Sequence, residues 1–149
     1  MDFIALLCTD CAIMIALQAW MLYLIPYAEQ KGMTPYEATT LASVGNIAYP
    51  LSAFVPALTE HSGVISDNHV RFIGLLISGI SFTVYPWFNS LASLICIAIP
   101  CLAAIGACHI TGMSVARNCN IGNFSQVVAY EMAAVSLGQY LGGLIPGIG

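Results

Sequence analysis

Residues 3–27 read FIALLCTDCAIMIALQAWMLYLIPY, and Asp10 carries the only charged side chain of this stretch. A helix of about 20 predominantly apolar residues is long enough to cross the hydrocarbon core of a bilayer. The stretch therefore predicts a transmembrane helix, and its length and flanks argue against a cleaved signal peptide. Four more apolar stretches of similar length follow, at 38–58, 70–88, 91–115 and 127–148.

None of the five stretches alternates apolar and polar residues with the period of two that a lipid-facing barrel strand requires. The predicted fold class is therefore all-α. We expect a polytopic membrane protein with about five transmembrane helices, which form a single transmembrane bundle over residues 1–149. Short connections make neighbouring helices antiparallel, and an odd number of passes places the two termini on opposite sides.

The composition of the whole chain leads to the same class of protein. Of 149 residues, 59% are apolar and 7% are charged, whereas a soluble domain carries about 25% charged residues. The apolar surface must face the lipid bilayer, which predicts an integral membrane protein and excludes a soluble enzyme. Three Lys or Arg residues against seven Asp or Glu residues leave no basic surface for the phosphates of a nucleic acid.

Cationic and aromatic residues near the span ends predict the orientation. The side that holds the N-terminus also holds Arg71 and Arg117, and the other side holds Lys31. The positive-inside rule therefore favours a cytoplasmic N-terminus. A belt of aromatic side chains is then expected at the outer interface, formed by Trp20, Tyr23, Tyr27, Tyr85 and Trp87.

Prolines within the spans predict irregular helices. Pro50, Pro56 and Pro100 each remove a backbone donor and clash with the preceding turn, so we expect kinked or broken helices at these positions. Such helices are frequent in transporters, although packing against neighbouring helices explains a membrane proline equally well.

Glycine spacing predicts which helix faces pack closely. The last apolar stretch holds two pairs of glycines four residues apart, Gly138 with Gly142 and Gly143 with Gly147. Such pairs let another helix approach the backbone closely. Glu131 shares a helical face with Gly138, and His109 lies between Gly106 and Gly112 at three residues on either side. Small residues beside an ionisable group indicate a packed interior face.

Three ionisable side chains fall inside the predicted spans: Asp10, His109 and Glu131. Each would cost several kcal/mol if it faced lipid, so we expect each to face protein or a water-filled cavity. They are candidates for a transport path, as a proton relay or as groups that bind a solute. Alternatively, Asp10 and Glu131 lie near span ends and reach the interface, and His109 is a neutral, hydrogen-bonded core residue.

The cysteines predict no metal site. Cys8 and Cys11 have the spacing of a redox or metal pair, but no second pair of Cys or His residues stands at ligand spacing. We interpret most cysteines as small buried hydrophobes and expect neither a metal nor a cofactor. The chain also lacks a phosphate-binding loop, a nucleophile elbow and a paired His-Glu helix motif, so we do not expect an enzyme.

A family resemblance centres on the end of the first predicted span. Tyr23-Leu24-Ile25-Pro26-Tyr27-Ala28 is followed by Gly32-Met33-Thr34, and then by Ala38, Leu41, Ser43, Gly45, Asn46 and Ile47. This pattern resembles the junction of the seventh and eighth helices in the monocarboxylate transporter family of the major facilitator superfamily. The resemblance implies helices seven to eleven of a twelve-helix transporter in the plasma membrane, with Asn46 as a further candidate for the transport path. It also implies a partner, either the missing transporter half or another membrane protein.

One departure from the family concerns the solute. The family's eighth helix carries an arginine, four residues after the Asn, that is thought to pair with a carboxylate. Pro50 occupies this position, and we find no cation inside a span to replace the arginine. The absence of this arginine is compatible with transport of a different or neutral solute, or with no transport. We expect the chain to be part of a secondary-active transporter that moves a small organic solute. We expect the chain to be inactive alone. The alternative is a non-transporting membrane protein that packs against partner helices.

Overall fold

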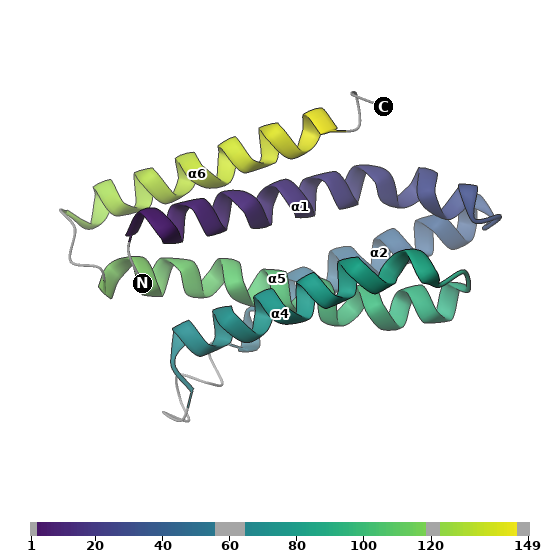
Figure 1. Ribbon diagram of the computed structural model, residues 1–149, viewed down its shortest axis with the longest axis horizontal. Helices are drawn as coiled ribbons and strands as arrows, with labels where there is room; N and C mark the ends of the chain where they lie inside the picture. The colour runs from purple at the N-terminus through teal and green to yellow at the C-terminus, as the bar shows by residue number, and fades with distance from the viewer. Residues whose placement is uncertain (1–2, 56–64, 119–122, 146–149) are drawn as a thin grey trace. The chain divides into compact units, whose positions relative to one another are not determined.

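The computed structural model describes residues 3–55, 65–118 and 123–145, and its regular elements are helices (Figure 1). The long helices in this part of the chain are α1 Phe3–Gln30, α2 Pro35–Leu51, α4 Asp67–Val84, α5 Leu91–Asn118 and α6 Phe124–Leu144. A short 3-10 helix, η1 Tyr85–Trp87, joins α4 to α5. No strand occurs among these described residues, so the all-α prediction is confirmed.

The helices group into two compact units, which we describe separately. Unit 1 comprises Met1–Tyr23 and Gly112–Gly149, and unit 2 comprises Leu24–Thr111. Helices α1 and α5 contribute residues to both units, because each unit boundary falls inside one of them. The single transmembrane bundle over residues 1–149 stays a prediction.

Among the residues that the structure describes, three helices are long and apolar enough to cross a membrane: Phe3–Gln30, Asp67–Trp87 and Leu91–Ala116. The sequence predicted five such spans. Helix α2 has 17 residues and is about 26 Å long, shorter than a hydrocarbon core of about 30 Å. Helix α6 has 21 residues but includes four uncharged polar side chains besides its glutamate: Ser125, Gln126, Ser136 and Gln139. Membrane crossing by α2 and α6 therefore stays a prediction.

One helix ends close to a proline. Pro50 lies inside α2, and the helix ends one residue later at Leu51 rather than at the predicted residue 58. Pro56 lies outside the described residues. Pro100 lies inside α5, and the helix continues on both sides of it, so the chain is not broken there. Elsewhere, helices extend about one turn beyond the predicted span ends at 27, 70, 115 and 127.

A tight turn connects α1 to α2 and fixes the start of α2. Gly32 has a φ of 82°, a left-handed conformation that glycine adopts without steric cost. The Glu37 backbone N–H donates to the Thr34 hydroxyl at 3.3 Å, and the Thr34 backbone N–H donates to the Glu37 carboxylate at 2.8 Å. These reciprocal bonds form a capping box, so α2 begins at Pro35, three residues before the predicted span.

We expect Thr34→Ala to fray the start of α2, with about fivefold faster amide exchange over residues 35–40. Hydrogen bonds from the Thr34 backbone and side chain lower the pKa of Glu37 below its ordinary value of 4.5. A lowered folded-state pKa stabilises the helix start above pH 4.5, and this stabilisation is lost as the pH falls through the lowered value. We would measure hydrogen–deuterium exchange and correct it for intrinsic rates. The difference in exchange between the wild type and Thr34→Ala should be full above pH 4.5 and smaller well below it. Thr39→Ala is the control, and an equal effect of that change would contradict the capping assignment.

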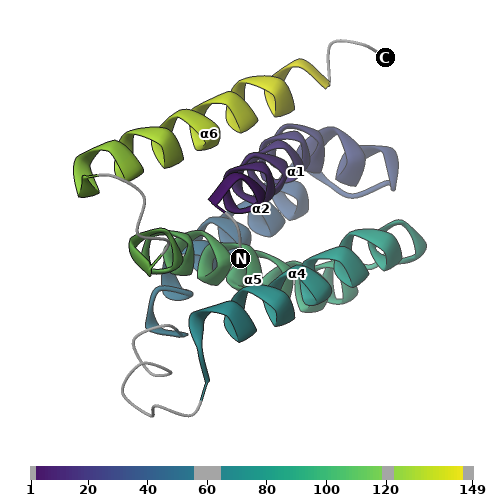
Figure 2. The same cartoon turned by 60° about the vertical axis from the view of Figure 1, so that its left-hand side comes forward.

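Glycines let the helices of unit 2 approach one another closely. Helices α4 and α5 form an antiparallel hairpin through η1 and lie side by side in both views (Figures 1 and 2). A Cβ atom at Gly74 of α4 would lie 3.0 Å from the carbonyl oxygen of Ala104 in α5. A Cβ atom at Gly106 of α5 would lie 2.6 Å from the carbonyl oxygen of Tyr49 in α2. Gly106 therefore lies where α5 and α2 approach each other closely.

Aromatic side chains bring the C-terminal ends of α1 and α4 together in unit 2. The ring centroids of Tyr27 and Tyr85 are 5.6 Å apart. Trp87, in the turn that follows, is 76% exposed. Tyr27 and Tyr85, which belong to the first and third predicted spans, therefore lie at the same end of this unit. An interfacial aromatic belt requires such an arrangement.

Candidate functional site

One stripe of α6 in unit 1 is buried, and it carries a carboxylate. The buried residues of this helix are Val127, Glu131, Val135, Gly138 and Gly142. Their spacing of three or four residues places them on one helical face. Glu131 is only 1% exposed. Glu131 and Gly138 are thus both buried on this face of α6.

The glycines of this stripe pack against α1 (Figure 1). A Cβ atom at Gly142 would lie 2.5 Å from the carbonyl oxygen of Ile15 and 2.9 Å from the Cβ atom of Gln18. One turn earlier, a Cβ atom at Gly138 would overlap the carbonyl oxygen of Cys11. The later glycine, Gly142, contacts the later residues of α1, so this part of α1 runs parallel to α6. Gly138 and Gly142 therefore lie where α6 and α1 approach each other closely.

Helix α1 contributes a second buried carboxylate to unit 1. Asp10 is 1% exposed and lies one turn after Leu6, which is fully buried. Leu6 belongs to an apolar cluster with Phe3, Val115, Ala116 and Val127. Val127 of the same cluster lies one turn before Glu131 on α6. Each buried carboxylate therefore lies one turn after a residue of the apolar cluster.

The parallel register places these carboxylates at similar levels of unit 1. Gly138 of α6 lies beside Cys11 and Met14 of α1. Glu131 lies two turns before Gly138, so it is roughly level with residues 4–7, which lie two turns earlier on α1. Asp10 then lies about one turn further along α1, or roughly 5 to 8 Å along the helix axis. Such deep burial argues against the alternative in which both side chains reach the membrane interface.

The other two transport-path candidates belong to unit 2. His109 is half-buried in α5, and its ring centroid lies 6.5 Å from that of Tyr49 in α2. Asn46 is exposed on α2. Gly112, the glycine that follows His109, is buried and belongs to unit 1. The structure therefore brings Asp10 and Glu131 together in one compact unit, and places His109 and Asn46 in the other.

Arg71 is a buried cation that the sequence pattern did not reveal. It lies in the second turn of α4 and is 2% exposed, within a helix long and apolar enough to cross a membrane. Its Nη1 atom donates to the carbonyl oxygen of Cys108 in α5 at 2.7 Å, and the Cys108 thiol donates to the Arg71 carbonyl oxygen at 3.4 Å. The expectation that no cation lies inside a span is therefore wrong. One turn later, Gly74 marks the face of α4 that packs on α5.

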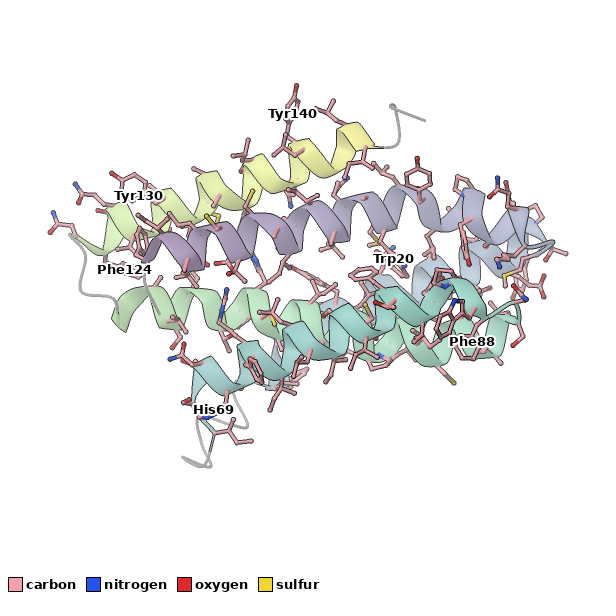
Figure 3. The ribbon with its side chains drawn as sticks, viewed as in Figure 1. Trp20, His69, Phe88, Phe124, Tyr130 and Tyr140 are labelled. Carbon is pink, nitrogen blue, oxygen red and sulfur yellow. The ribbon has the colours of Figure 1, made fainter. Side chains whose placement is uncertain are left out.

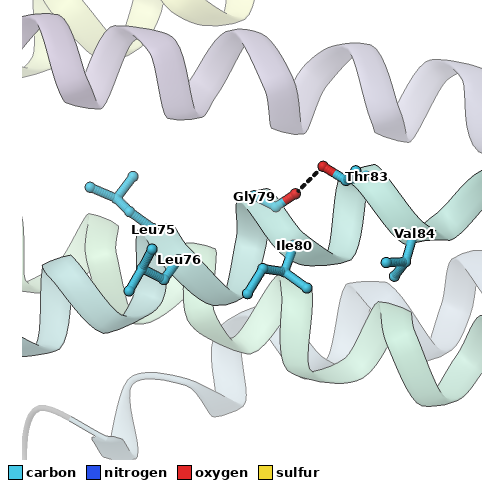
Figure 4. Close-up of a pocket in the computed structure, with 6 residues that line it drawn as sticks. All are labelled: Leu75, Leu76, Gly79, Ile80, Thr83 and Val84. Atoms are coloured by element: carbon cyan, nitrogen blue, oxygen red, sulfur yellow. Dashed lines mark hydrogen bonds between the residues drawn. The ribbon is translucent and has the colours of Figure 1, made fainter.

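Two grooves of unit 2 are apolar. The first, of about 360 Å³, lies between α4, α5 and the segment after α2 and is lined by Val55, Ile65, Val70, Ile73, Gly74, Ile77, Pro100, Ala103, Ala104 and Ala107. The second, of about 340 Å³, lies on α4 alone and is lined by Leu75, Leu76, Gly79, Ile80, Thr83 and Val84 (Figure 4). The Thr83 hydroxyl donates to the Gly79 carbonyl oxygen at 2.8 Å. None of the described residues that line the two grooves is ionisable.

The chemistry of the candidate site is that of its carboxyl groups. Over residues 3–55, 65–118 and 123–145, no three His, Cys, Asp or Glu side chains gather as a set of metal ligands. Cys8 and Cys11 on α1 are free thiols, the first exposed and the second half-buried. Buried carboxyl groups can bind or release a proton, or accept hydrogen bonds from a polar solute.

Comparison with known proteins does not assign the chain to a family. No protein-family model, curated protein or solved structure matches it. The resemblance to monocarboxylate transporters therefore rests on the residues of the sequence, and the transporter assignment is a proposal.

Proposed function

We propose that the chain is part of a secondary-active membrane transporter for a small organic solute, and that the carboxylates of unit 1 belong to its transport path. The observation that carries this proposal is the burial of Asp10 and Glu131, each 1% exposed, in helices made mostly of apolar residues. Burying an ionisable group in such surroundings costs several kcal/mol, so intramembrane carboxylates usually serve proton or solute movement.

The junction of α1 and α2 supports the transporter assignment. Pro26 lies in the last turns of α1, Gly32 turns the chain, and Thr34 caps α2. These residues belong to the part of the sequence that resembles the monocarboxylate transporter family. A helix–turn–helix corner at this point fits the connection between the seventh and eighth helices of that family.

The charges of the described residues favour a neutral or protonated solute over a free carboxylate. Pro50 is exposed where the resemblance would place an arginine. Arg71 is 2% exposed and donates to a backbone carbonyl group, so a solute does not reach it in this conformation. Two buried carboxyl groups, Asp10 and Glu131, would repel an anion if either were ionised.

The proposed activity requires a second half. Transporters of this kind work by rocking two repeats against each other around a site near the middle of the membrane. The helices described here correspond to a single half. We propose that the chain acts in the plasma membrane together with the missing transporter half or another membrane protein.

A second candidate function is that of a non-transporting membrane protein that packs against partner helices. The observation that favours it is a set of large side chains on the exposed part of α6: Phe124, Tyr130 and Tyr140 are 53%, 55% and 67% exposed (Figure 3). Tyrosines on such a face suit a partner helix or the membrane interface better than the lipid core, because each hydroxyl needs a hydrogen-bond partner.

Uptake into liposomes distinguishes the two functions. We expect the chain alone to give no saturable uptake of small organic solutes, because one half cannot alternate its access between the two sides. Co-reconstitution with a six-span partner half, found by sequencing the transcript upstream of Met1, should give saturable uptake. Saturable uptake by the chain alone would contradict the need for a second half. A stable complex that shows no uptake would favour the packing function.

A further inference from the structure

Lys31 links two turns of unit 2 that are far apart in the sequence. Its Nζ atom donates to the carbonyl oxygen of Pro86 at 3.0 Å and to Oδ1 of Asn89 at 2.7 Å. It also lies 5.5 Å from the centroid of the Tyr27 ring, within the range of a cation–π interaction. An ammonium group has three N–H donors, and these two acceptors use two of them.

The position of Lys31 is determined by the backbone around it. It follows α1 directly and precedes Gly32, whose φ of 82° turns the chain toward α2. The acceptors lie 55 and 58 residues away, at Pro86 in η1 and at Asn89 just before α5. The ring contact between Tyr27 and Tyr85 lies beside this link. One side chain thus connects the turn between α1 and α2 to the turn between α4 and α5.

We propose that Lys31 is a clasp that holds this end of unit 2 closed, so that the two turns move as one block. Hydrogen bonds from a charged donor are stronger than those between neutral groups. Both acceptors, a carbonyl and an amide oxygen, stay neutral at any pH at which the protein is folded. The Lys31 clasp therefore needs no acidic partner. It does not depend on transport, so it can fail without affecting the proposed function.

The reactivity of the amine tests the clasp without removing it. Lys31 is the only lysine of the chain, so acylation by a water-soluble acetylating ester can be assigned to it by mass spectrometry. A hydrogen-bonded ammonium is protected, because the ester reacts with the free amine. We expect Asn89→Ala to speed acylation of Lys31 about fivefold in nanodiscs. Asn68→Ala changes an exposed asparagine of α4 in the same unit and should leave the rate unchanged.

A second measurement shows whether the clasp holds the distant turn. Lys31→Met should raise amide exchange over residues 85–90 about fivefold, whereas Lys31→Arg keeps a cationic donor and should keep most of the protection. Equal acylation rates in the wild type and in Asn89→Ala would overturn the clasp. Unchanged exchange over residues 85–90 in Lys31→Met would also overturn it. If Lys31→Met does not fold, the rates for Asn89→Ala and Asn68→Ala decide the matter.

Discussion

Gly138→Leu is expected to destabilise unit 1 by about 3 kcal/mol or more. Even a Cβ atom at this position would overlap the carbonyl oxygen of Cys11 and lie 2.8 Å from the Cβ atom of Met14. Backbone atoms of α1 cannot rotate away as a flexible side chain can, so α6 would have to separate from α1. Unfolding of the purified chain in mixed micelles of dodecyl maltoside and SDS, followed by circular dichroism, measures the change.

Gly143→Leu is the matched control for this variant. It makes the same substitution in the same helix with the same gain in helix propensity, but a Cβ atom at Gly143 meets no atom within 4 Å. We expect its free energy of unfolding to equal that of the wild type or to rise by up to about 1 kcal/mol, the gain in helix propensity. Equal destabilisation by the two changes would contradict the packing of α6 on α1. The predicted pair of Gly143 with Gly147 gains no support, since Gly143 faces open space and Gly147 lies outside the described residues.

The apolar stretches were sufficient to predict the helices but not their limits. Helix α5 begins at the predicted residue 91. Helix α2 does not follow its predicted span, because a hydrogen-bonding cap at Thr34 fixes its start and Pro50 precedes its end. Hydropathy reports the surroundings of a segment, whereas local hydrogen bonds and steric clashes determine where a helix begins and ends.

Burial of the candidate carboxylates was predictable, but the burial of Arg71 was not. Asp10 and Glu131 lie within long apolar stretches, where an exposed charge is costly whatever the packing. Arg71 is the second residue of its predicted span, a position from which its side chain could equally reach the interface. It donates to the backbone carbonyl group of Cys108, which any residue could supply, so no sequence pattern marks the pair. Asn46 was a candidate through the resemblance alone, and it is exposed.

Glu131→Gln is expected to lower solute accumulation driven by an inward proton gradient at least about tenfold in the complete transporter. Glutamine has the shape of glutamate and forms hydrogen bonds, but it cannot take up and release a proton. Uptake in the absence of a gradient should continue, and the free energy of unfolding should change by about 1 kcal/mol or less. Uptake into liposomes that contain the chain and its partner half, with and without the gradient, measures the effect.

Glu29→Gln makes the same chemical change at an exposed position of α1 and should leave the dependence on the gradient intact. If Glu131 serves only packing, Glu131→Gln will also leave the gradient dependence intact, because the amide can keep the hydrogen bonds of the buried site. Gly138→Leu would still destabilise unit 1 in that case, because its effect comes from the close approach of α6 to α1. Loss of gradient dependence in Glu131→Gln, with stability preserved, therefore assigns the carboxylate to proton movement. Unchanged gradient dependence in Glu131→Gln, together with loss of stability in Gly138→Leu, assigns it to the α1–α6 contact.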